Sequence, residues 1–391
     1  MPEQAARILV VDDNEMNRDM LSRRLQRRGF DTAIAINGRD ALNVLEAEPF
    51  DLVLLDIMMP EMDGYEVLQH LKASEALRHL PVIMISARDD IESVVRCIEL
   101  GAEDHLPKPF NATLLGARIG ASLEKKRLRD RERLYAKALQ RELDIGREIQ
   151  TGFLPEVLPE IEGWEIAATF QPATQVAGDF YDAFLLPDRR HAGLVIADVC
   201  GKGVGAALFM ALFRSLIRMG MTQAFASGAD DLHTKVADLA ASVNNYIART
   251  HERANMFATS FIGILDTTNG TLVYTNAGHD PPMIIAPGAA GPVRLATSGP
   301  ALGLMPDLHF STAELVLAPG EALFCFTDGV CDARDPDGIG FSEENIVQHV
   351  VDPVHNAREL LERIETAVLT HRRGADPFDD ITMLAVRRKT V

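Results

Sequence analysis

The chain has 391 residues, a length typical of two or three domains. Apolar residues make up 47% and charged residues 25%, which excludes a mostly disordered protein. The formal net charge of −18 gives the chain as a whole no attraction to nucleic-acid phosphates or anionic membranes, so we expect neither as a partner.

We also expect no membrane span and a cytoplasmic location. The longest apolar stretch, Val204–Phe213, ends at Arg214 and is too short to cross a bilayer, so a buried helix is predicted there. The first residues lack a basic region followed by an apolar one, as a secretory signal would have. The four cysteines form no CxxC pair and no metal-binding spacing, which favours a reduced, cytoplasmic chain.

Short apolar runs alternate with helical patterns over the first third of the chain. The runs predict strands at Arg7–Val11, Thr32–Ile36, Asp51–Leu55, Pro81–Ile85 and Glu103–Leu106. Some runs are apolar throughout, as strands covered on both faces are. The alternation predicts an α/β fold with an open, doubly wound sheet of five parallel strands.

Polar side chains follow these predicted strands at the edge where ligands of α/β sheets bind. They are Asp12, Asp13, Asp56, Ser86 and Lys108. A single acid in such a place is more often a turn or N-cap residue. Three acids at one edge instead favour Mg²⁺, which prefers oxygen ligands, and Asp56 then becomes a candidate nucleophile for a phosphoryl group. Lys108 and the metal would neutralise the charge of that group.

Four motifs in this region resemble the receiver domain of two-component response regulators. They are VVDD at 10–13, LLDIMMPEMDG at 54–64, SA at 86–87 and KPF at 108–110. The resemblance covers residues 5–123, and we assign the domain to 1–123. It implies a flavodoxin-like fold, a histidine kinase as partner and Asp56 as the phosphoacceptor.

The same resemblance implies roles for the neighbouring side chains. It implies Mg²⁺ bound by Asp13, Asp56 and the carbonyl of Met58, with Asp12 in support. Ser86 and Lys108 would sense the phosphoryl group. His105 occupies the position of the ring that changes rotamer, where the family often has Tyr or Phe.

Residues 124–148 are rich in charge and contain no proline, which predicts a long solvated helix. Two apolar stripes compete on this helix, and neither sustains clean heptads. They are Tyr135, Ala138, Ile145 and Ile149, and Leu139, Leu143 and Gly146. We assign 124–153 to a helical linker that forms either a coiled-coil homodimer or a helix packed on a neighbouring domain.

Strand-like runs dominate the remainder, residues 154–391, which we assign to one further domain. The predicted strands are Trp164–Phe170, Gly193–Ala197, Ser260–Leu265, Thr271–Asn276, Ala322–Thr327 and Ile381–Val386. The predicted helices lie near 204–221, 230–250, 343–350 and 357–373. Grouped strands and grouped helices predict an α+β fold.

Four acidic motifs in this region could converge on one site. They are VAGDFYD at 176–182, VIADVCGKG at 195–203, CFTDGV at 325–330 and PFDDIT at 377–382. Each acid taken alone is more often a turn residue. Together they would bind two hard cations that hold a phosphoester and activate water, and aspartate favours Mg²⁺ or Mn²⁺ over zinc.

These motifs resemble metal-dependent serine/threonine protein phosphatases of the PPM group, in its SpoIIE branch, over residues 150–388. The resemblance also rests on REIQTGFLP at 147–155, GKGVGAALFMA at 201–211 and NAGHDPP at 276–282. It implies an αββα sandwich and metal-dependent phosphatase activity.

The resemblance also assigns the acids. Asp198 would bridge both metals. Asp179 and the carbonyl of Val199 would complete one metal site, and Asp328 and Asp379 the other. Asp380 would have a supporting role, His279 a structural or substrate-side role rather than metal ligation, and Cys200 would be a packed residue.

The two resemblances together predict a phosphatase that phosphorylation of Asp56 controls, either by releasing or by imposing inhibition. We place the coupling at REIQTGFLP, just after the long helix. The family suggests an anti-anti-sigma (STAS) phosphoprotein as substrate. The alternative is a catalytically weak adaptor that binds a protein of a sigma pathway under receiver control.

Overall fold

The computed structural model describes residues 5–86, 91–109, 111–226, 231–351 and 355–390. Ala87 and Phe110, which complete two of the receiver motifs, and Asp230, the first residue of a predicted helix, lie outside these ranges. The chain divides into two compact units, Met1–Leu139 and Gln140–Val391.

Unit 1 contains a five-stranded parallel sheet in the order β2-β1-β3-β4-β5. Its strands are β1 (Arg7–Val11), β2 (Asp31–Ala35), β3 (Leu52–Asp56), β4 (Val82–Ser86) and β5 (Asp104–Pro107). Its helices are α1 (Glu15–Gln26), α2 (Gly38–Ala47), α3 (Gly64–Ala73), α4 (Ile91–Glu99) and the first part of α5 (Ala112–Thr151). The predicted doubly wound receiver fold is confirmed, and each strand agrees with its prediction within one residue.

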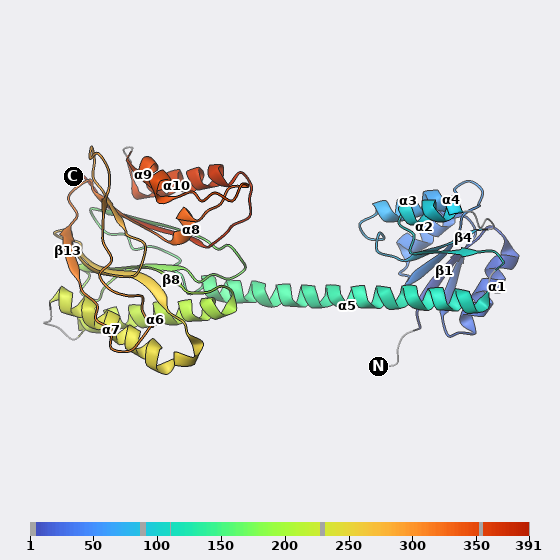
Figure 1. Cartoon of the computed structure of the whole chain (residues 1–391), viewed down its shortest axis with the longest axis horizontal. Coiled ribbons are helices and arrows are strands. Elements are labelled where there is room, and N and C mark those ends of the chain that lie inside the picture. The colour runs from blue at the N-terminus through green and yellow to red at the C-terminus, as the bar shows by residue number, and fades with distance from the viewer. Residues whose placement is uncertain (1–4, 87–90, 110, 227–230, 352–354, 391) are drawn as a thin grey trace. The chain divides into compact units, whose positions relative to one another are not determined.

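Helices cover both faces of this sheet (Figure 1). Leu21 of α1 and Ile119 of α5 pack on one face, together with the buried side chains of Ile8 and Leu52. The helices α2, α3 and α4 cover the other face, where the packed residues include Leu68 and Cys97. Burial on both faces explains why the central strands β3 and β4 are apolar along almost their whole length.

The helix α5 is 40 residues long and contains the whole charged segment that was predicted as a helix. Within unit 1, Lys125 and Arg129 form ion pairs with Glu103, and Lys126 forms one with Asp51. The start of the charged segment therefore packs on the receiver domain.

Apolar side chains further along α5 are exposed within the single chain. Leu134, Tyr135 and Leu139 are 69%, 70% and 59% exposed. A second copy of α5 could cover them, so the coiled-coil homodimer stays a prediction.

Unit 2 contains two five-stranded antiparallel sheets, in the orders β13-β10-β9-β8-β7 and β12-β11-β14-β15-β6. Its strands are β6 (Trp164–Gln171), β7 (Phe180–Leu185), β8 (His191–Val199), β9 (Ala258–Asp266), β10 (Thr271–Ala277), β11 (Met283–Ile285), β12 (Val293–Arg294), β13 (Ala313–Val316), β14 (Ala322–Phe326) and β15 (Ile381–Arg388). Its helices are α6 (Val204–Ala226), α7 (Leu232–Thr250), the 3-10 helix η1 (Glu252–Ala254), α8 (Asp328–Cys331), α9 (Glu343–Val350) and α10 (Ala357–Arg372).

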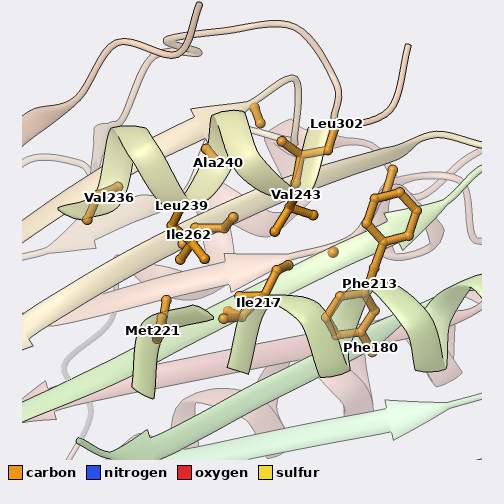
Figure 2. Close-up of a cluster of buried hydrophobic side chains, with 14 of the residues drawn as sticks. Phe180, Phe213, Ile217, Met221, Val236, Leu239, Ala240, Val243, Ile262 and Leu302 are labelled. Atoms are coloured by element: carbon orange, nitrogen blue, oxygen red, sulfur yellow. The ribbon is translucent and has the colours of Figure 1, made fainter. Parts of the chain in front are cut away.

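Four layers make up this unit, which confirms the αββα sandwich. The helices α6 and α7 cover one sheet, and α9 and α10 cover the other (Figure 1). A core that includes Trp164 and Phe261 fills the space between the sheets. A second core lies under α6 and α7, and Figure 2 shows Phe180, Phe213 and Val243 within it.

The helix α6 contains the apolar stretch noted in the sequence. By length and composition the segment Val204–Phe225 could cross a membrane, and 33% of its most apolar window is buried. Phe213 and Ile217 of this helix lie in the core against the sheet (Figure 2). The expectation of a buried helix at this position is therefore confirmed for its sheet-facing side.

Candidate functional site

Three carboxylates of unit 1 come together at the carboxyl ends of β1 and β3. One carboxylate oxygen from each of Asp12, Asp13 and Asp56 lies within 4.8 Å of the other two. They meet because β1 and β3 are neighbouring parallel strands, which end at the same edge. Asp12 and Asp56 are buried, whereas Asp13 is exposed. Carboxylates this close repel one another without a cation, so the cluster fits Mg²⁺.

A lysine from the end of the sheet joins this cluster. Nζ of Lys108 lies 2.8 Å from Oδ2 of Asp12 and 2.9 Å from Oδ2 of Asp56. Burial raises the pKa of the Asp56 carboxyl, and the Lys108 ammonium acts in the opposite direction. Asp56 thus lies beside a positive charge that could neutralise an added phosphoryl group.

The other predicted receiver residues lie on β4, on β5 and in the loop after β3. Ser86 ends β4 and is buried, and β4 pairs with β5. His105 is buried in β5 opposite Met84. Met58 follows Asp56 by two residues, and its side chain is 71% exposed. The loop after Asp56 is tightly packed, because a Cβ at Gly64 would lie 2.3 Å from the carbonyl oxygen of Asp56.

The four predicted acids of unit 2 lie at the ends of two pairs of neighbouring strands, β7 with β8 and β14 with β15. Asp179 directly precedes β7, and Asp198 lies near the end of β8, which pairs with β7. Asp328 is the first residue of α8, after β14, and Asp379 precedes β15, which pairs with β14. Each sheet therefore contributes two acids.

Asp198 is the acid that interacts with all the others. Burial raises the pKa of Asp198 to about 7, with a further contribution from the charge of Asp328 and smaller ones from Asp379 and Asp380. A hydrogen bond with Asp179 acts in the opposite direction on this pKa. Asp198 thus has the central place that a residue bridging two metals requires.

This group of acids is wider than the cluster in unit 1. Over the described residues, a triad of potential ligands within 4.8 Å occurs at Asp12, Asp13 and Asp56 and not in unit 2. A wider group of four carboxylates fits two cations. Burial, and then the charge of neighbouring acids, raises the pKa of Asp198 and Asp328, and the cations would offset both effects. The donors are carboxylates, which Mg²⁺ and Mn²⁺ prefer.

Two threonines hold Asp179 in place. The hydroxyls of Thr327 and Thr382 each donate to Oδ2 of Asp179 at 2.7 Å, and all three residues are buried. Burial first, and then the charge of Asp198, raises the pKa of Asp179 well above its ordinary value. Neither threonine was predicted as a site residue, although both lie inside the acidic motifs: Thr327 directly precedes Asp328, and Thr382 follows Asp380 by two residues.

Asp380 supports the backbone around Asp179. Its carboxylate accepts hydrogen bonds from the N–H groups of Ala173 at 2.7 Å and Gly178 at 2.9 Å. Gly178 cannot gain a side chain, because a Cβ there would lie 2.7 Å from the carbonyl oxygen of Val199. A Cβ at Gly329 would likewise lie 1.8 Å from the carbonyl oxygen of Asp380. These glycines let the acidic segments approach one another closely.

His279 and Cys200 are structural in their contacts. Nδ1 of the buried His279 lies 3.0 Å from Oγ1 of Thr259, and burial lowers the pKa of the imidazole to about 4. The sulfur of Cys200 contacts the backbone N–H of Phe257 at 3.3 Å. Both residues thus tie loops near the acids to the sheet.

The end of α5 reaches the same region of unit 2. Gln150 is buried, and its side chain forms two hydrogen bonds with the backbone of Ala177. Ala177 lies two residues before Asp179. Gln150 belongs to REIQTGFLP, the segment predicted to couple the two domains, and nothing in the local sequence pattern marks it within that segment.

Two protein families match this chain. Residues 188–389 match the family described as Stage II sporulation protein E (SpoIIE), and residues 8–120 match the response regulator receiver domain. One match lies in each unit, and both agree with the two resemblances stated from the sequence motifs, although the SpoIIE match begins after Asp179.

Two known proteins are similar to parts of this chain. The chain is 42% identical over 264 residues to Protein IcfG of Synechocystis, a match that covers 63% of this chain and 41% of that protein. It is 40% identical over 119 residues to Response regulator MprA of Mycolicibacterium vanbaalenii, covering 30% of this chain and 51% of that protein. The matches thus span about half the length of these relatives.

A solved structure matches the fold of unit 2. The SiaA-PP2C domain of Pseudomonas aeruginosa superposes with a TM-score of 0.52 at 23% identity, covering 65% of this chain and 98% of that domain. At this identity the likeness concerns the fold alone. With the match to more than half of the chain, the protein belongs to the Stage II sporulation protein E (SpoIIE) family and carries a response regulator receiver domain in its first unit.

Proposed function

We propose that this protein is a response regulator in which phosphorylation of Asp56 controls a metal-dependent phosphatase acting on phosphoserine or phosphothreonine of a protein. The observation that carries the proposal is the convergence of acids from both sheets around Asp198, whose pKa is raised to about 7 by burial and by the acids around it. A buried group of carboxylates of this kind is stable as a charged set only with cations.

In the phosphatase domain Asp198 would bridge two Mn²⁺ or Mg²⁺ ions. Asp179 and the carbonyl of Val199 would complete one site, and Asp328 and Asp379 the other. When bound, the ions would polarise the phosphoester and activate a water for in-line attack. The hydroxyls of Thr327 and Thr382 would keep Asp179 oriented, since they bond the oxygen Oδ2 and leave Oδ1 to a metal.

In the receiver domain Asp56 would accept the phosphoryl group from a histidine kinase, with its carboxylate as nucleophile. Asp13, Asp56 and the carbonyl of Met58 would bind Mg²⁺, with Asp12 in support. Lys108 already contacts Asp56 and would pair with the phosphoryl oxygens, and Ser86 and His105 would respond to the new group. This assignment rests on the acidic cluster and the lysine contact.

The signal would pass along α5, which begins in the receiver fold and carries Gln150 in its last turn. Because Gln150 bonds the backbone two residues before Asp179, a shift of the helix end would displace a proposed metal ligand. The exposed apolar residues of α5 would form a homodimer in which that shift takes place. Either release or imposition of inhibition fits this geometry.

We further propose a phosphorylated anti-anti-sigma (STAS) protein in the cytoplasm as the substrate, on the family resemblance. The second candidate is an adaptor that binds such a protein without catalysis. The complete set of acids favours the enzyme, since an adaptor would have no need of four converging carboxylates.

The test is hydrolysis of p-nitrophenyl phosphate by the full chain with Mn²⁺, with and without beryllofluoride, beside Asp198→Ala. Metal-dependent turnover that the substitution removes and beryllofluoride changes is the expected result. Turnover that persists in Asp198→Ala would contradict the proposed site. If neither this substrate nor a phosphorylated STAS protein is hydrolysed, while the STAS protein is bound, the adaptor is favoured.

A further inference from the structure

Two basic side chains flank an exposed aromatic ring beside the proposed metal site. Nζ of Lys202 lies 5.1 Å from the centroid of the Phe378 ring, and Cζ of Arg334 lies over the same ring at 3.5 Å. Lys202 and Arg334 are exposed, and Phe378 is 39% exposed. Phe378 directly precedes Asp379, so these three residues, here called the cationic rim, border the acids of unit 2.

Lys202 is held in the rim by its backbone and by its ammonium group. It stands between Gly201 and Gly203, whose φ angles of 88° and 79° make a turn that favours glycine. Its Nζ donates to the carbonyl oxygen of Phe378 at 2.8 Å and lies 2.8 Å from Oδ2 of Asp379. This contact points the ammonium at a proposed metal ligand.

Arg334 comes from a different segment, the turn after α8. The turn is closed by a bridge between Arg334 and Gly340 and anchored by ion pairs of Arg373 with Asp335 and Asp337. Arg334 itself forms no ion pair with any of the residues that the structure describes. Stacking on Phe378 uses the face of the guanidinium, whereas an anion would bind the N–H groups at its edge.

Charge indicates what this rim would bind. The chain carries a formal charge of −18, and the acids around Asp198 are themselves repelled by a phosphate group. An anionic substrate therefore needs local positive charge at the site. Lys202 could serve only to neutralise Asp379, with which it forms an ion pair. That role would not explain why Arg334 lies over the same Phe378 ring.

We propose that Lys202 and Arg334 bind the phosphoryl group and adjacent acidic residues of a protein substrate, with Phe378 as the platform on which the substrate segment lies. The cationic rim would thus select acidic phosphorylated segments over neutral ones. This inference rests on the proposed function, because it concerns the substrate of the same site.

Binding can be measured without catalysis. The full chain in EDTA is titrated against a fluorescein-labelled peptide with one phosphoserine between acidic residues, followed by fluorescence anisotropy. Arg334→Ala should weaken binding about three- to tenfold, as expected for loss of a charged contact at a partly exposed site, and Arg334→Lys should recover part of it. Arg358→Ala, an exposed arginine on α10, is the matched control and should bind as the unchanged chain does.

Lys202 is tested with Mn²⁺ present, where Lys202→Gln should raise KM for the phosphopeptide more than it lowers kcat, and Lys202→Arg should restore KM. Equal affinity of Arg334→Ala and the unchanged chain would overturn the proposal. So would equal weakening by Arg358→Ala, equal binding of the unphosphorylated peptide, or an unchanged KM in Lys202→Gln. Absence of metal-dependent turnover in the unchanged chain would instead contradict the proposed function, and the EDTA titration would still decide on the rim.

Discussion

The side chain of Gln150 brackets the backbone of Ala177. Its Nε2 donates to the carbonyl oxygen of Ala177 at 2.5 Å, and its Oε1 accepts from the N–H of Ala177 at 2.9 Å. One side chain thus satisfies both polar groups of a buried residue next to the segment of Asp179. Because Gln150 belongs to the last turn of α5, the position of a proposed metal ligand depends on where that helix ends.

Replacing this amide should uncouple the helix from the metal site. Gln150→Ala leaves two buried backbone groups without these partners, which costs about 1–3 kcal/mol for each unsatisfied group. We expect phosphatase activity with Mn²⁺ to fall roughly tenfold, as for loss of an outer-shell contact. The exposed Glu148 on the same helix provides the control Glu148→Ala, which should keep its activity. Equal activity in both variants would show that this contact does not position the site.

The role of Asp56 as phosphoacceptor can be tested separately from the phosphatase activity. Asp56→Asn removes the nucleophilic carboxylate but keeps a polar group beside Lys108. We expect acetyl phosphate and beryllofluoride to change the activity of the unchanged chain and to have no effect on Asp56→Asn. Basal turnover of p-nitrophenyl phosphate, measured in the same assay, is the internal control. A response to beryllofluoride that survives in Asp56→Asn would exclude control through this residue.

The fold of unit 1 was predictable because its central strands β1, β3 and β4 are largely apolar runs between helical patterns. Unit 2 was less so. The strand β7 was not predicted, since its sequence FYDAFL places an acid inside a strand. This acid, Asp182, is buried, and its charge is neutralised by ion pairs with Arg214 and Arg218 of α6. The strands β11, β12 and β13 are only two to four residues long, and runs that short have no clear period.

The site was predictable as a set of acids but not as a geometry. Asp198 and Asp328 stand in motifs with glycine, which marked them in the sequence. Their supporting partners come from far along the chain: Thr327 and Thr382 lie 148 and 203 residues from Asp179. Only the pairing of β14 with β15 and the packing of the two sheets bring these hydroxyls to Asp179. The local pattern of the sequence contains no signal for such contacts.

The two threonines should set metal affinity. Thr382→Val keeps the shape of the side chain but removes the hydroxyl that donates to Asp179. The hydroxyls lower the pKa of Asp179 against the effect of burial, so their loss should favour its protonated form and weaken Mn²⁺ binding by about 10- to 100-fold. Mn²⁺ titration by calorimetry measures this, with Thr382→Ser expected to retain most of the affinity. Thr366→Val, on the exposed face of α10, is the control, and an unchanged affinity in Thr382→Val would argue against this role.

The raised pKa of Asp198 predicts how stability depends on pH without metal. In the folded chain this pKa is about 7, whereas the ordinary value is 3.8. The folded state therefore holds a proton on Asp198 that the unfolded state has lost, and between pH 5 and 7 this group makes folding less favourable as pH rises. Asp198→Asn removes the titration. In EDTA we expect the melting temperature of Asp198→Asn to rise relative to that of the unchanged chain as pH increases from about 5 to about 8.

Comparing the two chains at each pH cancels the contribution of His279, which titrates in the opposite sense in both, and leaves that of Asp198 together with its effect on the neighbouring acids. Burial lowers the pKa of His279 to about 4, so its contribution to stability increases with pH up to the unfolded value and then stays constant. Mn²⁺ should reverse the order of the two chains at pH 8, since it binds the ionised carboxylates and stabilises the unchanged chain by mass action. A difference in melting temperature that stays constant with pH would mean that Asp198 is ionised at every pH tested. Positive charge other than a metal ion would then have to stabilise the acids in EDTA.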